Sequence, residues 1–426
     1  MQPPRYPEAI RDPIHGYVRL TEFELAGIDA REVQRLRSIA QLGMTDRVYP
    51  GARHSRFEHA LGTLEVATRI FEDLRGRLGI DGLLPRLGLP PRAVDYERLL
   101  ALTRWVALLH DVGHPPFSHV TEGLLPGGRS HEQLTVDLVR GGQVGGVLRR
   151  SDPTLLDDVV RVLEAMSFTS EDAASGGECL PPPLAFAREV IAGEVGADRM
   201  DYLLRDSAAT GVSYGIFDLD RILHTLVPVE AGRGGLRLGV ERGGVLAVEG
   251  MLWGRISMFQ QVYFHRTRRI FDHHLVQFLR TNLPGGVYPA DGAGFTEWSD
   301  WRVWELLRRA ESDAAQAGHE DAVRILARRH HRALPQELEG RDEGSVREWL
   351  AAWSARVVAE VPDADPIADL VTAPRAVTGE LRVVGPGGNV EPLLDRSSWI
   401  VRFEPRSIGR LYVRRDLDPA LVPNYP

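Results

Sequence analysis

The segment YERLLALTRWVALLHDVGHPPFSH, residues 96–119, decides the fold class of this chain. Its first half is apolar on almost every side, a pattern typical of a helix buried in a protein interior. The glycine and the proline pair that follow end this helix, because proline cannot continue it. His110 and Asp111 therefore leave an apolar helix at its terminus, where an imidazole and a carboxylate need polar partners. A divalent metal ion is one such partner.

Helical periodicity also dominates the flanking sequence. Residues 31–43, which Gly43 is expected to end, and residues 56–79 have the pattern of amphipathic helices. Further helical patterns occur at 131–140, 155–165, 184–192, 198–209, 217–226 and 250–281 and, after a connection at 282–297, up to about residue 372. A small hairpin is expected at 232–250, and short strands are expected at 381–385, 399–405 and 410–415. These patterns predict a mostly α protein, divided into residues 1–281 and a mixed α/β C-terminal lobe, residues 282–426.

The composition is that of an ordinary globular protein. The 426 residues carry a net charge of −8, which argues against a general nucleic-acid coat protein. The single cysteine, Cys179, excludes an intrachain disulfide framework. No apolar run approaches the roughly 18–20 residues that span a bilayer, and the first residues lack the plan of a signal peptide. We therefore expect a cytoplasmic protein. All 51 basic residues are arginine, so a phosphate site must use arginine, histidine or backbone N–H groups.

Histidines and carboxylates recur in compact motifs near the buried helix. Of the 14 histidines, five lie in the motifs RFEHALG, HDVGHPPFSH and SHEQ. A single His–Asp pair at a helix end is more often a cap or a salt bridge than a metal site. His59 and Asp198 are natural further ligands for a metal at the His110–Asp111 pair. The four would supply two imidazoles and two carboxylates and leave positions open for water or phosphate.

At this point the sequence resembles the HD-domain phosphohydrolase superfamily, with its characteristic first histidine, His–Asp pair and distant closing aspartate. The closest resemblance is to its dNTP triphosphohydrolase branch, the sterile-alpha-motif-and-HD-domain triphosphohydrolases and their bacterial homologues. The segments that carry it are DPIHG (12–16), QRLRSIAQLG (34–43), YPGARHSRFEHALG (49–62), LLHDVGHPPFSH (108–119), ADRMDYLLRDSAATG (197–211) and RISMFQQVYFHRTRR (255–269). The resemblance covers roughly residues 10–280 and implies an HD-domain helical core.

The resemblance also implies roles for the residues that match the metal centre of the family. One divalent metal (Mn, Fe, Zn, Ni or Mg) would be held by His59, His110, Asp111 and Asp198, and Mg would accompany the substrate phosphates. His114 with a nearby carboxylate would manage protons at the α-phosphorus, since an imidazole titrates near neutral pH. His119 and His131 match residues on the phosphate side. With three further imidazoles near this metal, binding of a second metal ion also stays possible.

The residues that would bind the rest of the substrate follow from the same resemblance. The cationic positions that grip the triphosphate are Arg56, Arg199 and Arg255; at Arg199 the closest relative has Lys. The sugar pocket would be lined by Gln41, Leu42, Tyr202, Asp206 and Tyr263. Within it, Gln41 and Asp206 would hydrogen-bond the 3′-hydroxyl, and Tyr202 would exclude a ribose 2′-hydroxyl.

A regulatory nucleotide, GTP or a dNTP, is a further implication of the resemblance. Asp29, Gln34 and Arg37 match the positions that read it between subunits. Glu8 replaces a Lys of the family there, and an acidic side chain against a phosphate is unfavourable. The family also implies a homo-oligomer, a dimer or a tetramer.

These observations lead to a metal-dependent dNTP triphosphohydrolase as the expected function. Two alternatives stay open. Another HD-type phosphohydrolase, such as a nucleotidase, phosphodiesterase or nuclease, would need only the metal ligands. A non-catalytic nucleotide sensor or nucleic-acid-binding scaffold would bind nucleotide without turnover.

Overall fold

The fold is known from a computed structural model of the chain. It describes residues 6–167, 180–231, 235–373, 375, 377, 380–400, 403–418, 420 and 422–424. Cys179 and part of the strand expected at 399–405 lie outside these described residues. Helices dominate the described part, which confirms the mostly α fold expected from the sequence. Within these ranges, the structure contains no helix that is both long enough and apolar enough to cross a membrane.

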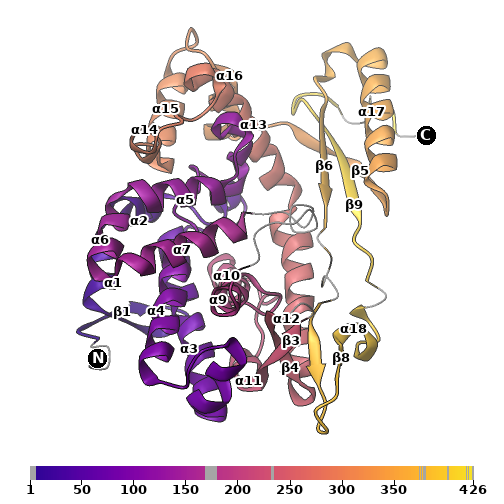
Figure 1. The fold of residues 1–426 in the computed structure, drawn as a ribbon. Helices are drawn as coiled ribbons and strands as arrows, with labels where there is room; N and C mark the ends of the chain where they lie inside the picture. The colour runs from indigo at the N-terminus through magenta and orange to yellow at the C-terminus, as the bar shows by residue number, and fades with distance from the viewer. Residues whose placement is uncertain are drawn as a thin grey trace.

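Three helices form the centre of the molecule: α3 (Arg56–Leu83), α4 (Ala93–Leu109) and α10 (Ala197–Thr210). At the start of α3, the Glu58 carboxylate accepts a hydrogen bond from the backbone N–H of Ser55, which caps the helix. Trp105 and Leu108 on α4 are buried, as expected for an all-apolar helix. Because α3 packs against both α4 and α10, it brings the C-terminal end of α4 close to the first turn of α10 (Figure 1).

The described residues form further helices besides these three. Those before α10 are α1 (Glu22–Ile28), α2 (Arg31–Arg35), α5 (His131–Gly141), α6 (Gln143–Ser151), α7 (Pro153–Met166) and α9 (Pro182–Ala192). Those after it are α11 (Leu219–Thr225), α12 (Val245–Met258), α13 (Arg266–Asn282), α14 (Gly292–Thr296), α15 (Asp300–Ser312), α16 (His319–Leu326), α17 (Glu343–Glu360) and α18 (Leu393–Arg396).

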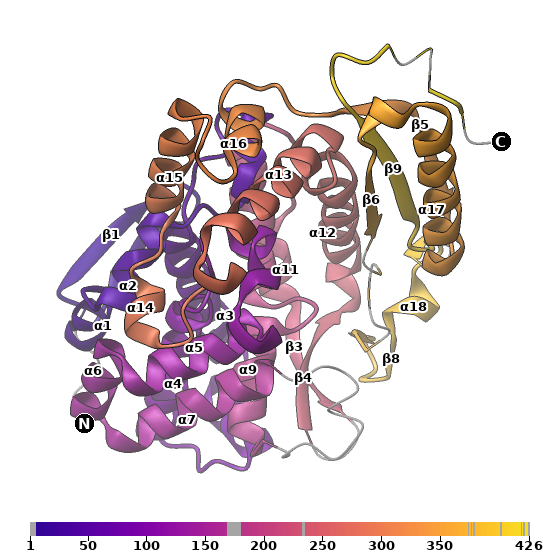
Figure 2. The same ribbon diagram turned by 90° about the horizontal axis from the view of Figure 1, so that it is seen from above.

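The strands form three small sheets among the described residues. An antiparallel hairpin pairs β1 (Glu8–Asp12) with β2 (Gly16–Leu20). A four-stranded sheet has the order β3 (Leu226–Ala231), β4 (Gly235–Glu241), β7 (Arg382–Val384) and β8 (Val390–Pro392), and β4 and β7 run parallel. An antiparallel sheet has the order β5 (Arg332–Gly340), β9 (Ser407–Val413) and β6 (Ile367–Thr372). Helix α17 packs on this last sheet (Figure 2).

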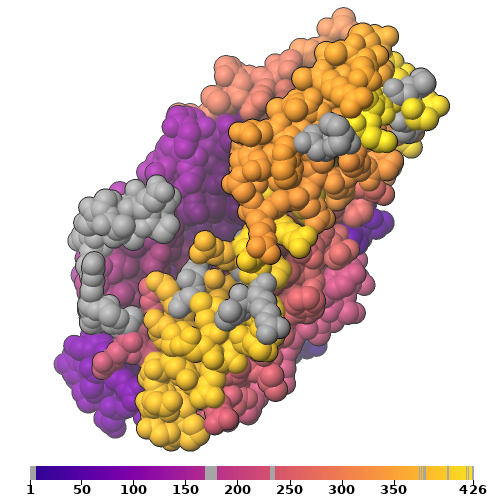
Figure 3. All heavy atoms as spheres, turned by 90° about the vertical axis from the view of Figure 1, so that its right-hand side faces the viewer, coloured from indigo at the N-terminus to yellow at the C-terminus, as the bar shows by residue number. Residues whose placement is uncertain are grey.

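Among the described residues, buried apolar side chains form two clusters. The larger one includes the central helices and also α14, α15 and α16, through residues such as Phe295 and Leu307. The smaller one lies between α17 and the β5–β9–β6 sheet and includes Leu338, Trp353 and Leu411. In the space-filling view, the orange and yellow C-terminal part of the chain borders a hollow in the surface, opposite the violet helices (Figure 3).

Some expected element boundaries were wrong. The helix expected at 31–43 ends at Arg35 and passes through a 3-10 turn at 36–38. Beyond this turn the backbone is extended, because the N–H of Gln41 bonds to the carbonyl of His54 and Ile39 accepts from the N–H of Arg56. The hairpin expected at 232–250 lies earlier, at 226–241, because Val248 turns inward as part of α12.

Further differences lie after residue 250. The helix expected at 250–281 is two helices separated by a π-turn at 259–263. Strands β5 and β6 replace part of the helical pattern expected up to 372, since both pair with β9. Of the three short strands expected near the end, 381–385 and 410–415 correspond to β7 and β9, whereas the residues described from 399 to 405 are not in a strand.

Candidate metal centre and adjoining cavity

Four side chains from three helix ends converge on one point. His59 lies in the first turn of α3, His110 and Asp111 follow α4, and Asp198 lies in the first turn of α10. The carboxylate of Asp198 is 3.1 Å from Nε2 of His59 and 3.8 Å from Nε2 of His110. The carboxylate of Asp111 is 3.6 Å and 3.5 Å from the same two nitrogens. The structure therefore brings together all four ligands expected from the sequence.

The two imidazoles are held with Nε2 toward this point. Nδ1 of His59 bonds to a carboxylate oxygen of Asp201 at 2.7 Å, and Nδ1 of His110 lies 2.8 Å from the carbonyl oxygen of Ala107. In both rings Nδ1 is the donor, so in the neutral form of each ring Nε2 carries the lone pair. Nε2 of His110 is buried and has no hydrogen-bond partner among the described residues. A buried nitrogen lone pair beside two carboxylates fits a divalent metal ion.

The electrostatics of the centre point the same way. Burial opposes a charge on His59, but the carboxylates of Asp198 and Asp201 outweigh it and raise the pKa of this imidazole to about 10. Burial raises the pKa of Asp111, but the Arg56 guanidinium and neighbouring imidazoles hold it well below its usual range. The carboxylates thus favour a positive charge at this point, and a metal ion would take the place of the proton.

An outer layer of polar side chains fixes the ligands, and the sequence analysis did not find it. Asp201 is fully buried and also bonds to Nε2 of His15 at 2.7 Å and to Arg205. Arg205 in turn donates to Asp12 at 2.9 Å. The available signal was the spacing of Asp198, Asp201 and Arg205, which places the three on neighbouring turns of one helix.

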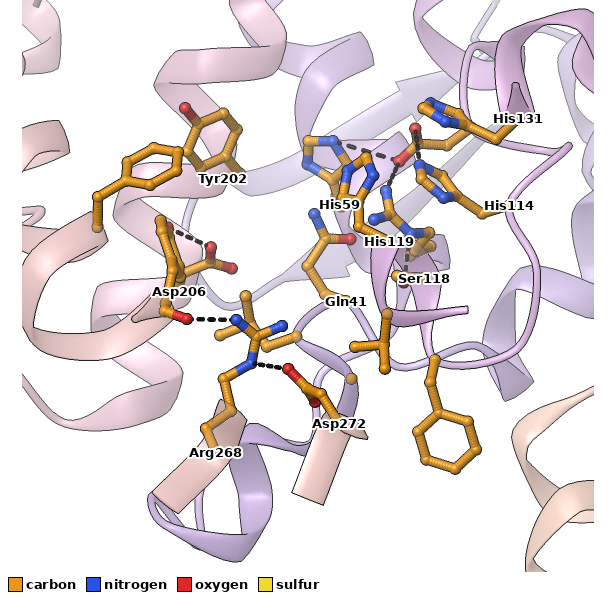
Figure 4. Close-up of a pocket in the computed structure, with 18 of the residues that line it drawn as sticks. Gln41, His59, His114, Ser118, His119, His131, Tyr202, Asp206, Arg268 and Asp272 are labelled. Carbon is orange, nitrogen blue, oxygen red and sulfur yellow. Dashed lines mark hydrogen bonds and ion pairs between the residues drawn. The ribbon is translucent and has the colours of Figure 1, made fainter. Parts of the chain in front are cut away.

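A second group of imidazoles lies beside the first (Figure 4). The ring of His114 stacks on that of His131 at 3.7 Å, and His119 lies edge-on to both. Burial lowers the pKa of His114 well below its usual value, and the nearby Arg56 acts in the same direction. Glu122, which the sequence analysis missed, contacts Nδ1 of His119 at 2.9 Å and Nδ1 of His131 at 2.5 Å. The carboxylate beside His114 itself is that of Asp111, 3.3 Å from its Nε2, so the proton-handling role expected for His114 stays a prediction.

A cavity of about 940 Å³ extends from the metal centre. Its wall includes the sugar-pocket residues expected from the sequence, Gln41, Leu42, Tyr202, Asp206 and Tyr263. Asp206 accepts a hydrogen bond from the hydroxyl of Tyr263 and contacts Nε2 of His54, both at 2.7 Å. The side-chain oxygen of Gln41 is buried without a partner among the described residues. His54 had no distinguishing signal in the sequence.

The opposite wall is formed by residues of α13 that sequence reasoning also missed. They are Arg268, Arg269, Asp272, His273, Gln277 and Arg280. Asp272 lies 3.2 Å from Nε of Arg268, and Arg269 forms a bidentate pair with Asp369 of β6. Both pairs border the cavity (Figure 4 shows the first), so the C-terminal part of the chain contributes to its wall.

Several expected residues are placed differently from the pattern. Arg56 borders the cavity, but it is buried and donates to Asp111 at 2.5 Å. Arg199 and Arg255 do not line the cavity; they donate to the backbone oxygens of Glu194 and Arg375. The cavity does not test the residues expected to bind a regulatory nucleotide between subunits. Among them, Arg37 donates to Gln34 at 3.0 Å on the α2 side, and Asp29 caps α1. Their role stays a prediction.

The comparisons with known proteins agree with this geometry. Residues 56–206 match the HD domain, and residues 217–403 match the HD associated region. The first range contains all four side chains of the metal centre. The second contains the α13 wall of the cavity and most of the C-terminal strands.

Individual relatives extend the comparison. A crystal structure of a hypothetical protein from Aquifex aeolicus is 31% identical, with a TM-score of 0.77, and the match covers 97% of this chain and 98% of that one. An uncharacterised protein of Methanocaldococcus jannaschii is 37% identical over 265 residues, 62% of this chain and 48% of the relative. The deoxynucleoside triphosphate triphosphohydrolase SAMHD1 of Danio rerio is 27% identical over 308 residues, 68% of this chain and 47% of the relative. The chain spans about half the length of these curated relatives.

Proposed function

The chain belongs to the HD-domain superfamily of phosphohydrolases, and from this premise we propose that it hydrolyses a deoxynucleoside triphosphate to a deoxynucleoside and inorganic triphosphate. The observation that carries the proposal is the continuity of the cavity. One wall holds the four candidate metal ligands, and another holds the side chains suited to a deoxyribose. The likeness to SAMHD1 supports the same substrate class, at 27% identity.

Each part of the site has a task in this reaction. A divalent ion held by His59, His110, Asp111 and Asp198 would neutralise phosphate oxygens and lower the pKa of water. The His119–Glu122–His131 group would hold protons beside the phosphate chain. Burial keeps His114 neutral, and its Nδ1 has no hydrogen-bond partner among the described residues. The metal identity is left open by this donor set, which suits Mn, Fe, Zn, Ni or Mg.

The deoxyribose would be selected by Tyr202 and Asp206. They lie one turn apart on α10, so both point to the same side of the helix. Asp206 is oriented by His54 and Tyr263, which leaves it able to accept from a 3′-hydroxyl together with Gln41. The half-buried ring of Tyr202 would then occupy the space that a 2′-hydroxyl requires.

One observation favours a second candidate, a nucleotidase or phosphodiesterase of the same superfamily. Arg199 and Arg255, which would grip the triphosphate, do not line the cavity. A shorter phosphate chain would not need them. Regulation by GTP or a dNTP, and assembly into a dimer or tetramer, remain proposals; Glu8 in place of the family lysine weighs against the first.

Product chromatography separates these functions. Each dNTP and rNTP is incubated with the protein and Mn²⁺ or Mg²⁺, with and without GTP or a second dNTP. Our proposal predicts deoxynucleoside and intact inorganic triphosphate from dNTPs, and little product from rNTPs. Release of orthophosphate or pyrophosphate, or turnover only of monophosphates or phosphodiesters, would instead establish the second candidate.

A further inference from the structure

We propose that Asp300, at the start of α15, is a positioning residue that holds the histidine loop 110–119 in its active form from the C-terminal side of the chain. The inference rests on the proposed function only in its general form, hydrolysis at the metal centre. It assigns a task to the HD associated region that the metal ligands alone do not explain.

The side chain of Asp300 joins two distant segments. One carboxylate oxygen accepts the backbone N–H of Phe117 and the other accepts the backbone N–H of Ala40, each at 2.8 Å. Asp300 is only 6% exposed, so water does not take the place of its carboxylate as acceptor for these backbone N–H groups. Ala40 precedes the sugar-pocket residue Gln41, and Phe117 lies between His114 and His119. One carboxylate thus joins two segments that border the cavity, at Ala40 and at Phe117, to α15.

The loop that it holds has an unfavourable backbone. Phe117 and Ser118 have φ values of 60° and 59°, in the left-handed region that non-glycine residues seldom adopt. Such a conformation persists only where the surrounding contacts enforce it. The hydrogen bond from Phe117 to Asp300 is one such contact, and it acts directly on the first of the two residues.

A chain of hydrogen bonds connects this point to the metal centre. The hydroxyl of Ser118 donates to the carbonyl oxygen of Ala40 at 2.6 Å and accepts from Nε of Arg56 at 2.7 Å. The same guanidinium donates to the metal-ligand carboxylate of Asp111 at 2.5 Å. A shift of the backbone at residues 117 and 118 therefore moves Arg56, and with it the orientation of Asp111.

A second contact fastens the same C-terminal segment to the same loop. Arg35 of α2 donates to the carbonyl oxygen of Trp298 at 2.8 Å and to that of Val112 at 3.4 Å. Its guanidinium also lies 4.6 Å from the ring centre of Phe295. Burial raises the pKa of Asp300 to about 7, while the two backbone donors and Arg35 oppose this rise. The carboxyl group of Asp300 thus lies buried where α15 meets the segments of Ala40 and Phe117, although burial disfavours its charge.

The test compares Asp300→Asn and Asp300→Ala with a matched control, Asp291→Asn. Asp291 lies in the same segment and accepts the backbone N–H of Gly294 at 2.7 Å, but it is exposed and caps only its own helix. Hydrogen–deuterium exchange is measured for peptides covering residues 38–42 and 115–121. The value of kcat is measured on whichever phosphate substrate the wild type hydrolyses.

We expect amide exchange in both peptides to rise at least tenfold in Asp300→Ala and by less in Asp300→Asn, which keeps one acceptor oxygen. We expect kcat to fall at least tenfold in Asp300→Ala, whereas Asp291→Asn changes neither quantity by more than twofold. Exchange that stays at the wild-type rate in both peptides, or that rises equally across the whole chain, would overturn the proposal. Exchange does not depend on the substrate, so it tests this role even where the wild type fails to hydrolyse dNTPs.

Discussion

Nδ1 of His59 lies 2.7 Å from a carboxylate oxygen of Asp201, which is itself fully buried. This contact fixes the ring so that Nε2 faces Asp111 and Asp198. The position of a metal ion in this centre thus depends on Asp201, which contacts the ligand His59 and not the ion itself. Partners of this kind commonly tune metal affinity as strongly as some ligands do.

We predict that Asp201→Asn lowers metal affinity by about 10–100-fold, because His59 loses the partner that fixes its tautomer. Isothermal titration of Mn²⁺ into metal-free protein measures this directly. Asp220→Asn is the control, since Asp220 is exposed and contacts only Arg69 at the surface. Equal affinity in the wild type and Asp201→Asn would show that the outer carboxylate is not needed to orient the ligand.

Gly62 lies on α3 where α10 approaches most closely. A Cβ atom at this position would lie 1.9 Å from Oδ1 of Asp201 and 2.2 Å from the guanidinium of Arg205. We predict that Gly62→Ala destabilises the protein by about 1–3 kcal/mol through overpacking, as measured by denaturant unfolding.

Gly76 provides the control for this substitution. It lies on the same helix, and a Cβ atom there would meet nothing within 4 Å. Gly76→Ala should stabilise the protein by about 0.5–1 kcal/mol, because alanine is the better helix former. Similar effects of the two substitutions would argue against the tight α3–α10 contact.

Tyr202 is the residue that we expect to distinguish deoxyribose from ribose. We predict that Tyr202→Ala reduces the ratio of kcat/KM for dGTP over GTP by at least about tenfold, because the space for a 2′-hydroxyl opens. The measurement is steady-state kinetics with both nucleotides. A variant that rejects GTP as strongly as the wild type does would remove Tyr202 from this role.

His331 is a buried histidine with two titratable neighbours. Nε2 of His331 lies 3.1 Å from Asp365, and Nδ1 lies 3.3 Å from His274. Burial lowers the pKa of His331 to about 4, and the charges of His274 and Arg324 act in the same direction. The folded protein therefore binds fewer protons here than the unfolded chain between about pH 6.5 and pH 4.

It follows that the contribution of His331 to stability is present above about pH 6.5 and is lost as the pH falls toward 4, with a slope of at most about 1.4 kcal/mol per pH unit. We predict that the free energy of unfolding, from urea titrations at pH 7, 6 and 5, falls more steeply for the wild type than for His331→Gln. The exposed His224 serves as control, because His224→Gln should follow the wild type. Parallel curves for the wild type and His331→Gln would contradict this account.

The sequence was informative where one short motif sets both fold and chemistry. The buried helix that ends at His110 and Asp111 predicted an α-helical core. The four metal ligands expected from the sequence converge in the structure. It was less informative about strands β5 and β6, because each is stabilised by pairing with β9 rather than by its own pattern.

The polar partners of the site were missed for a related physical reason. The contacts of Asp201 with His15, and of Asp300 with Ala40, join segments that are far apart in the chain. A single aspartate in a helical pattern does not differ from one on a solvated face until the packing is known. The same limit applies to Arg199 and Arg255, which donate to backbone oxygens and are not among the residues that line the cavity.

The most direct test of the central claim is an anomalous difference map from a crystal of this protein grown with Mn²⁺. We predict one strong peak within coordination distance of Nε2 of His59, Nε2 of His110 and the carboxylates of Asp111 and Asp198. A peak held only by the neighbouring imidazoles, or an empty site between the four side chains at saturating Mn²⁺, would contradict the account.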